Sequence, residues 1–264
     1  MKTNERIVIK IGTSTLTYEN GKANLRRIEQ LCKVISDLQN MGKEIIVVSS
    51  GALSVGVGKM NIDRSGHTLK ERQALAAVGQ CELMFIYDKL FGEYNHTIAQ
   101  ILLIKTSVES PQRRENILNT INTLLSMGVI PIINENDTVA TDELEGENFG
   151  DNDMLSAIVA RLVSADGLII LTDIDGLYDK NPRKFADAKL IPLVAEITDD
   201  IRAIAGGTGS NRGTGGMATK ISAAHYCMQS GISCRVINGS KPDVLYDIFD
   251  GKDVGTLFCR TEQN

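Results

Sequence analysis

Short runs of branched apolar residues alternate along the chain with longer segments in which apolar positions follow a helical period. Five apolar runs are expected to form strands, at residues 7–11, 44–48, 129–133, 167–171 and 232–237. Four longer segments are expected to form helices, at residues 25–41, 113–127, 155–165 and 217–230. Strands that are apolar at nearly every position are covered on both faces, and their alternation with helices favours parallel pairing. The pattern therefore predicts an α/β fold with an open, mainly parallel sheet sandwiched between helices, in three αβα layers.

Small polar residues follow each expected strand. The clusters are Gly12-Thr13-Ser14, Ser49-Ser50-Gly51, Asn134-Glu135-Asn136-Asp137, Thr172-Asp173 and Asn238-Gly239-Ser240. In open α/β sheets, ligands bind beyond the carboxyl ends of the strands. The topology therefore predicts a binding site at that edge of the sheet.

Length, composition and charge narrow the class of protein. The chain has 264 residues, of which 42% are hydrophobic and 23% charged, so we expect an ordinary globular protein with a single domain over residues 1–264. A formal net charge of −5 provides no basic field for nucleic acid or anionic lipid, which favours a small-molecule partner. The polar N-terminus and the lack of any long apolar run predict a cytoplasmic protein with no membrane partner.

The side chains that most often act as nucleophiles, general bases and metal ligands are scarce. Five cysteines include no C-x-x-C pair and lie among apolar neighbours, so we expect buried free thiols. None of the three histidines lies at an expected strand end, and no H-E-x-x-H or G-x-S-x-G motif occurs. Catalysis by histidine is therefore disfavoured. Phosphoryl transfer is favoured, because it needs mainly positioning and charge neutralisation by lysines, amides and Mg²⁺.

Three segments have features of a phosphate site. Lys10 lies inside an apolar strand that ends in glycine and hydroxyl residues, Ser50-Gly51-Ala52 repeats this ending, and the Gly-rich segment 213–220 opens a helix with Lys220 about one turn inside. Backbone N–H groups at helix starts attract anions. None of these segments is a Walker A motif. An edge-strand charge, a turn and a connector would explain them singly, but a lysine in an apolar strand must be paired or reach solvent.

A second polar set combines amides with carboxylates. Asn134 and Asp137 follow one strand, and Asp151-Asn152-Asp153 precedes a helix expected to begin near Met154, where an aspartate is expected as a cap. Capping explains one aspartate. The rest of the set suits either a grip on an ammonium and a carboxylate together or the holding of two lysines in place. A carboxylate acceptor, with a reference pKa of about 4.3, is ionised at neutral pH and needs no general base.

Six motifs in order resemble those of the amino acid kinase family over nearly the whole chain. They are Val8-Ile9-Lys10-Ile11-Gly12-Thr13-Ser14, Val48-Ser49-Ser50-Gly51-Ala52, Asn134-Glu135-Asn136-Asp137, Gly150-Asp151-Asn152-Asp153, Leu171-Thr172-Asp173-Ile174-Asp175-Gly176-Leu177-Tyr178 and Gly213-Thr214-Gly215-Gly216-Met217-Ala218-Thr219-Lys220. Within the family, the resemblance is to members that phosphorylate the γ-carboxylate of L-glutamate with ATP. It implies formation of L-glutamyl 5-phosphate, the first step of proline biosynthesis.

The resemblance also implies roles for individual residues. Lys10 and Lys220 would stabilise the transferring phosphoryl group, and Asp153 would hold both lysines. Glutamate would be bound by Ser50, Asp137 and Asn152, with Asn134 nearby. Asp151 and Asp153 would orient Mg²⁺ through water. ATP would contact Lys10, Thr172, Asp173, Thr214, Gly215, Gly216, Met217, Ala218, Thr219 and Lys220.

Regulation and assembly are likewise implied by the resemblance. Members form dimers or tetramers, so we expect a homo-oligomer. Members are often inhibited by L-proline, and the acidic segment after Asp137 lies where glutamate and proline would be sensed. Many bacterial members carry an additional C-terminal PUA domain, an RNA-binding type of module. This chain ends at Asn264, shortly after its last expected strand, and is expected to act without that module.

Two alternatives remain open. One is another kinase of the same fold that acts on N-acetylglutamate, aspartate, carbamate or UMP. The other is a non-catalytic amino acid sensor. The Ser-Ser-Gly-Ala and Asn-Glu-Asn-Asp motifs favour glutamate as the substrate, and the presence of both lysines favours an enzyme.

Overall fold

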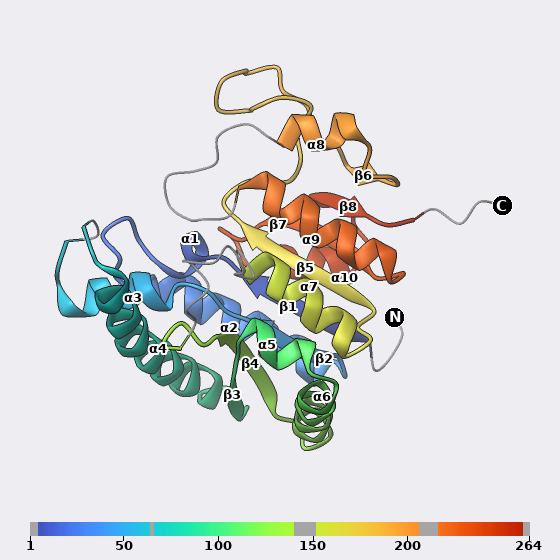
Figure 1. Ribbon diagram of the computed structural model, residues 1–264. Coiled ribbons are helices and arrows are strands. Elements are labelled where there is room, and N and C mark those ends of the chain that lie inside the picture. The colour runs from blue at the N-terminus through green and yellow to red at the C-terminus, as the bar shows by residue number, and fades with distance from the viewer. Residues whose placement is uncertain (1–4, 64–65, 140–151, 206–215, 261–264) are drawn as a thin grey trace.

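The computed structural model describes residues 5–63, 66–139, 152–205 and 216–260. Strands in these ranges form one eight-stranded sheet (Figure 1), in the spatial order β3 (Ile98–Leu103), β4 (Ile130–Glu135), β2 (Glu44–Val48), β1 (Arg6–Ile11), β5 (Gly167–Thr172), β7 (Ser233–Asn238), β8 (Thr256–Phe258) and β6 (Leu193–Val194). Neighbours from β3 to β7 all pair in parallel. Strand β8 runs antiparallel to β7, and β6 pairs in parallel with β8. The prediction of an open, mainly parallel sheet is confirmed, and the reversal at β8 was not predicted.

Helices cover both faces of the sheet (Figure 1), which completes the expected three layers. Their bounds are α1 (Thr13–Leu16), α2 (Leu25–Asn40), α3 (Ala52–Met60), α4 (Leu69–Gly92), α5 (Lys105–Glu109), α6 (Pro111–Ser126), α7 (Asn152–Leu162), α8 (Asp199–Ala205), α9 (Met217–Gln229) and α10 (Val244–Phe249). Helices α2, α4 and α10 share one buried apolar core with the sheet, and α6, α7 and α9 share a second core on the opposite face. In the described part of the chain, no helix is long and apolar enough to cross a membrane.

Strand β1 shows how alternation assigns side chains to the two faces. Ile7, Ile9 and Ile11 belong to the core formed with α2 and α4, whereas Val8 belongs to the core formed with α7 and α9. Because successive side chains of a strand point to opposite faces, Lys10 shares the face of Val8. Strand β1 lies between β2 and β5, so Lys10 is central in the sheet and is not an edge charge. The lysine is therefore directed at the face that α7 and α9 cover.

All five expected strands and four expected helices are present, with ends shifted by up to three residues. The largest shift is in α7, which begins at Asn152 and ends at Leu162. Several elements were not predicted, among them β3, α3, α4 and β8. Helix α4 has apolar residues around much of its circumference and so lacks a clear amphipathic period. Strand β8 has three residues, which is too short for a periodic signal.

Candidate active site

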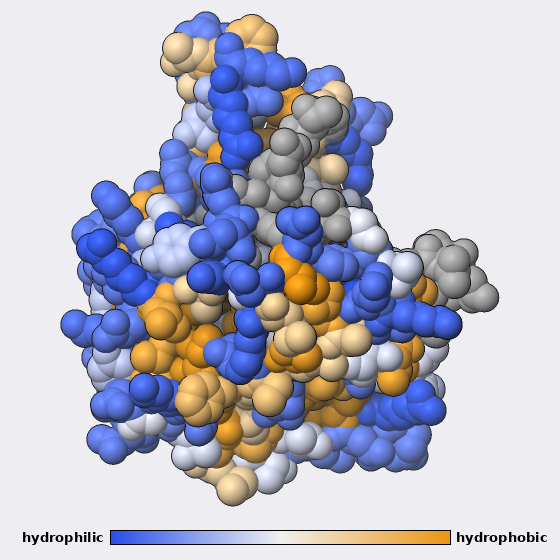
Figure 2. Space-filling view, turned by 90° about the vertical axis from the view of Figure 1, so that its left-hand side faces the viewer, coloured by the Kyte–Doolittle hydropathy of each residue, from blue (hydrophilic) through white to orange (hydrophobic). Residues whose placement is uncertain are grey.

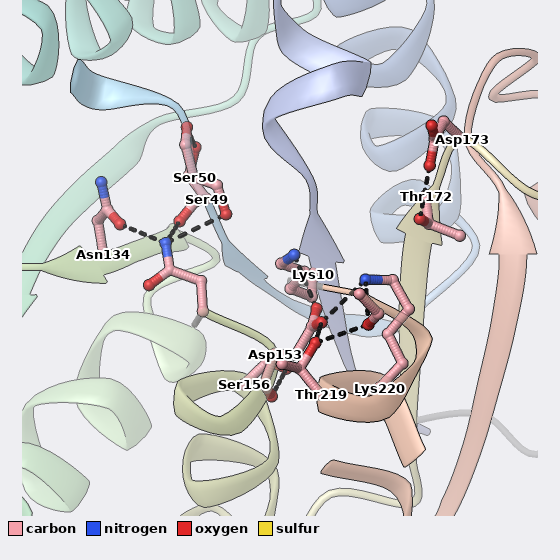
Figure 3. A network of polar contacts seen from close by, with 12 residues as sticks. Lys10, Ser49, Ser50, Asn134, Asp153, Ser156, Thr172, Asp173, Thr219 and Lys220 are labelled. Carbon is pink, nitrogen blue, oxygen red and sulfur yellow. Dashed lines mark hydrogen bonds and ion pairs between the residues drawn. The ribbon is translucent and has the colours of Figure 1, made fainter. Parts of the chain in front are cut away.

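Two lysines converge on one aspartate at the carboxyl edge of the sheet (Figure 3). Lys10 Nζ lies 2.7 Å from Asp153 Oδ1, and Lys220 Nζ lies 3.0 Å from Asp153 Oδ2. The exposed fractions of the lysine side chains are only 5% and 6%, and that of Asp153 is 0%. Strand β1, helix α7 and helix α9 thus bring three charged groups, far apart in the sequence, into one buried cluster.

The position of Asp153 in α7 explains why its carboxylate reaches both lysines. The helix begins at Asn152, so Asp153 lies in the first turn and is directed across the sheet edge. The hydroxyl of Thr219 donates to Asp153 Oδ2 over 2.8 Å. Asp153 is therefore not the helix cap that an aspartate in this segment was expected to be, because its oxygens face cationic and hydroxyl donors. Asp151, the other candidate for a cap, lies outside the described residues.

The charges in this cluster fix the ionisation of Asp153. Burial alone would raise the pKa of the carboxyl group, but the two ammonium groups lower it well below its usual range. One carboxylate between two ammonium groups leaves a net charge of about +1 at this place. Such a buried positive site suits a phosphate group, whose charge would complete the neutralisation.

A set of amides and hydroxyls lies on the β2 and β4 side of the lysines (Figure 3). Asn152 Nδ2 donates to the carbonyl oxygen of Ser49 at 2.6 Å and to Asn134 Oδ1 at 2.8 Å, and it lies 3.1 Å from Ser50 Oγ. Asn134 is only 2% exposed and Ser50 only 6%. The structure therefore brings Ser50, Asn134 and Asn152, which the family resemblance grouped together, into one hydrogen-bonded cluster.

Asp137 lies three residues after Asn134, just beyond the end of β4 at the same edge of the sheet. It follows β4 in a turn and is half-buried. Residues 140–151, which follow this turn, lie outside the described residues.

Three helices without side-chain caps begin at the edge of the sheet that carries the lysines and the amides. Helices α1, α3 and α9 begin after Gly12, Gly51 and Gly216, and none of these glycines can provide a side-chain cap. Their first-turn N–H groups therefore lack the acceptor that a Ser, Thr or Asp cap supplies, which favours anion binding. Gly51 has a φ of +84°, a left-handed conformation that favours glycine.

The expected ATP-binding residues lie mainly in two places, the start of α9 and the end of β5. Met217, Ala218 and Thr219 form the first turn of α9, directly after Gly216. Thr214 and Gly215 lie outside the described residues. Thr172 ends β5 and is only 6% exposed. Its neighbour Asp173 accepts a hydrogen bond from Arg183 Nη2 over 2.8 Å, an ion pair that the sequence did not predict.

Helix α4 supplies two polar contacts to the site that sequence reasoning missed. Gln80 Oε1 accepts a hydrogen bond from Asn134 Nδ2 over 2.7 Å. The Tyr87 hydroxyl lies 3.1 Å from Ser49 Oγ, and burial raises the pKa of Tyr87 above its usual range. No periodic signal marks α4, so neither side chain stood out from its neighbours.

The cysteines partly match expectation. All five are free, and Cys32, Cys227 and Cys234 are buried, whereas Cys81 is exposed and Cys259 is half-buried. The expectation that all five are buried is therefore wrong at two positions. Among the described residues, no group of three or more His, Cys, Asp and Glu side chains is placed to hold a metal ion.

Comparison with known proteins decides the family. The family model described as "Amino acid kinase family" matches residues 5–238. The chain belongs to the amino acid kinase family. A glutamate 5-kinase of Clostridium perfringens is 56% identical over 259 residues, which cover 98% of this chain and 96% of that protein. A glutamate 5-kinase of Listeria monocytogenes is 52% identical over 264 residues, 100% of this chain and 96% of that protein.

Solved structures of two other kinases share the fold. A UMP kinase from Bacillus anthracis has a TM-score of 0.64 with 19% identity, and 98% of this chain and 97% of that one are covered. An isopentenyl phosphate kinase from T. acidophilum has a TM-score of 0.66 with 18% identity, and 96% and 99% are covered. At this level of identity the likeness concerns the fold, and it agrees with the mainly parallel sheet described above.

Proposed function

We infer that this protein phosphorylates the γ-carboxylate of L-glutamate with ATP, which yields L-glutamyl 5-phosphate and ADP. The identity of 52–56% with glutamate 5-kinases over nearly the full length supports this reaction, which is the first step of proline biosynthesis. The single structural observation that carries the inference is the buried Lys10–Asp153–Lys220 cluster, which lies between an amide cluster and the end of β5.

The order of the strands supports an arrangement in which the two substrates meet near Lys10. Asn134 lies on β4, Ser50 follows β2, Lys10 lies on β1 and Thr172 ends β5, and these four strands are consecutive neighbours in the sheet. Three interstrand steps of about 4.8 Å give a span of roughly 14 Å from β4 to β5. We propose that glutamate lies at the β4 and β2 end, that the nucleotide lies over β5 and α9, and that phosphoryl transfer takes place near Lys10.

The chain's own residues would supply positioning and charge. A γ-carboxylate oxygen of glutamate attacks the γ-phosphorus, the bond from that phosphorus to the bridging oxygen of ADP breaks, and ADP leaves with the electron pair. The attacking carboxylate is already ionised, so no side chain has to remove a proton. Lys10 and Lys220 stabilise the negative charge on the transferring group, and Asp153 keeps the two ammonium groups at fixed positions.

Mg²⁺ fits this site as a companion of the nucleotide. When bound, it neutralises phosphate charge and orients the triphosphate. The oxygens of Asp153 already accept from Lys10, Lys220 and Thr219. We therefore propose that the phosphates of ATP would hold the metal, and that Asp153 would act on it only through water.

Glutamate recognition falls to Ser50, Asn134, Asn152 and Asp137 in this proposal. The first three form one hydrogen-bonded cluster, and Asp137 lies just beyond β4. Amides and a carboxylate together can bind the α-carboxylate and the α-ammonium group of an amino acid. Because proline carries the same two groups, we propose that it inhibits by binding at this end of the site.

We propose that the protein is a homo-oligomer assembled through helix α4. Its outer face carries the exposed apolar residues Ala74, Ala77, Cys81 and Phe85, which are three or four positions apart, and Phe85 is 63% exposed. Apolar residues also gather on the side of the molecule that bears α3 and α4 in Figure 2. A continuous apolar helical stripe on a surface is typical of a protein interface.

We place the protein in the cytoplasm, with no nucleic acid or membrane partner.

The reaction is tested by trapping its product. The purified protein is incubated with ATP, Mg²⁺, hydroxylamine and one acceptor at a time, and the hydroxamate is measured together with ADP. We expect hydroxamate with L-glutamate, and little with N-acetylglutamate or aspartate. Turnover with N-acetylglutamate but not with glutamate would assign the protein to another kinase activity, and binding of glutamate without ADP formation would favour a sensor.

A further inference from the structure

Gln80, on the inner face of α4, begins a chain of side-chain amides that leads into the proposed glutamate site. Its Oε1 accepts from Asn134 Nδ2 over 2.7 Å, and Asn134 Oδ1 accepts from Asn152 Nδ2 over 2.8 Å. Asn134 is buried, and Gln80 is half-buried. None of the motifs discussed above includes Gln80.

The direction of each hydrogen bond in this series of side-chain amides is fixed. The backbone N–H of Glu135 donates to Asn134 Oδ1 over 2.9 Å, so that oxygen accepts two bonds and uses both lone pairs. The Asn134 amide group must therefore point its Nδ2 at Gln80, which accepts one of its two N–H bonds. Within the described ranges, the other N–H of Asn134 has no acceptor and remains for a ligand.

The same count applies to Asn152. Its Nδ2 has two hydrogens and lies within 2.8 Å of two carbonyl oxygens, those of Ser49 and of the Asn134 side chain. No described residue donates to Asn152 Oδ1. The two asparagines thus offer a ligand one N–H donor and one C=O acceptor, which is the complement of a carboxylate and an ammonium group.

We propose that Gln80 is a positioning residue for glutamate recognition. It anchors Asn134, which in turn orients Asn152 so that the Asn152 oxygen accepts a hydrogen bond from the α-ammonium group of the substrate. Gln80 itself does not have to touch glutamate. This proposal rests on the proposed function and adds to it a specificity determinant on a helix that also carries the exposed apolar stripe.

Removal of the acceptor at position 80 tests the proposal through kinetics. In Gln80→Met the chain length of the side chain is kept and the accepting oxygen is lost, so Asn134 has an unsatisfied buried N–H group and no anchor. We expect KM for glutamate to rise about tenfold, equivalent to ~1.4 kcal/mol. We expect kcat and KM for ATP to stay within about twofold, because the lysine cluster is untouched. Gln80→Ala should act in the same direction and serves as a second variant.

Glutarate provides the specificity readout, since it has both carboxylates of glutamate but no ammonium group. We expect the Gln80 variants to lose more activity with glutamate than with glutarate. An equal loss with both acceptors would contradict the assignment of the Asn152 oxygen to the ammonium group.

Gln39 provides a matched control, because it lies near the amino ends of the strands, on the side of the sheet away from the site. Gln39 is also half-buried, and its Oε1 accepts from the backbone N–H of Ile45 at the start of β2. Gln39→Met removes the same kind of bond away from the site, so KM for glutamate should stay at the wild-type value. Wild-type KM in both Gln80 variants would overturn the proposal, whereas a wild-type protein without glutamate-dependent ADP formation would overturn the proposed function instead.

Discussion

The buried carboxylate of Asp153 is the most sensitive point of the site, and Asp153→Asn changes its charge with little change in shape. In the variant, the ammonium groups of Lys10 and Lys220 lose the anion that lies 2.7 and 3.0 Å away. Removal of one partner from a buried ion pair costs about 3–5 kcal/mol, because the remaining charge is left uncompensated. Two such charges side by side also repel each other, so the lysines are expected to move apart.

The loss should be visible in both stability and catalysis. At about 2–4 °C per kcal/mol for a protein near this size, the melting temperature of Asp153→Asn should fall by roughly 6–20 °C. We expect kcat to fall at least a hundredfold, a change of about 2.7 kcal/mol in the activation barrier. Calorimetry and a coupled ADP assay at a temperature where the variant remains folded measure the two effects separately. A folded variant with wild-type kcat would refute the reasoning.

The pH dependence of stability gives an independent check on Asp153. Its pKa in the folded protein lies below the unfolded value of about 3.9, so the ionised group stabilises the fold at pH values above that value. This stability is lost as the pH falls from about 4 toward the folded pKa. Between pH 5 and 3, the wild-type protein should therefore lose more stability than Asp153→Asn, and parallel melting curves for the two proteins would contradict the shift.

Three further predictions concern the lysines, the glutamate end and the assembly. Lys10→Ala and Lys220→Ala should each lower kcat a hundredfold or more in a folded protein, and near-normal turnover in either variant would remove that lysine from the mechanism. Asp137→Ala should raise KM for glutamate with KM for ATP little changed, and an effect on ATP alone would place Asp137 in the nucleotide site. Phe85→Asp, on the exposed stripe of α4, should shift the protein toward a monomer in light scattering, and an unchanged mass would exclude this face as the interface.

The sheet and the place of the site were predictable from local pattern. Apolar runs bounded by glycine and polar residues indicated the strands, and a lysine inside one of these runs required a partner. Alternation along β1 then places Lys10 on the face of Val8, where α7 and α9 lie. The position of the site at the strand ends followed from topology alone.

The partners within the site were harder to predict, because they depend on contacts distant in sequence. An aspartate at the start of a helix is commonly a cap, and only the packing of α7 against β1 and α9 directs Asp153 at the lysines. Gln80 and Tyr87 lie on a helix without a clear period, so nothing in the sequence pattern separated them from neighbouring core residues. The hydrogen bond from the Thr219 hydroxyl to Asp153 was likewise not predicted.

Oxygen-isotope transfer tests the central claim, that the γ-carboxylate of glutamate attacks the γ-phosphorus directly. Glutamate labelled with ¹⁸O in both γ-carboxylate oxygens is incubated with ATP, Mg²⁺ and hydroxylamine, and the released phosphate is analysed by mass spectrometry. Because hydroxylamine attacks the carbonyl carbon of an acyl phosphate, the account predicts one ¹⁸O atom in each phosphate released. Unlabelled phosphate would show that water, and not the carboxylate, accepts the phosphoryl group.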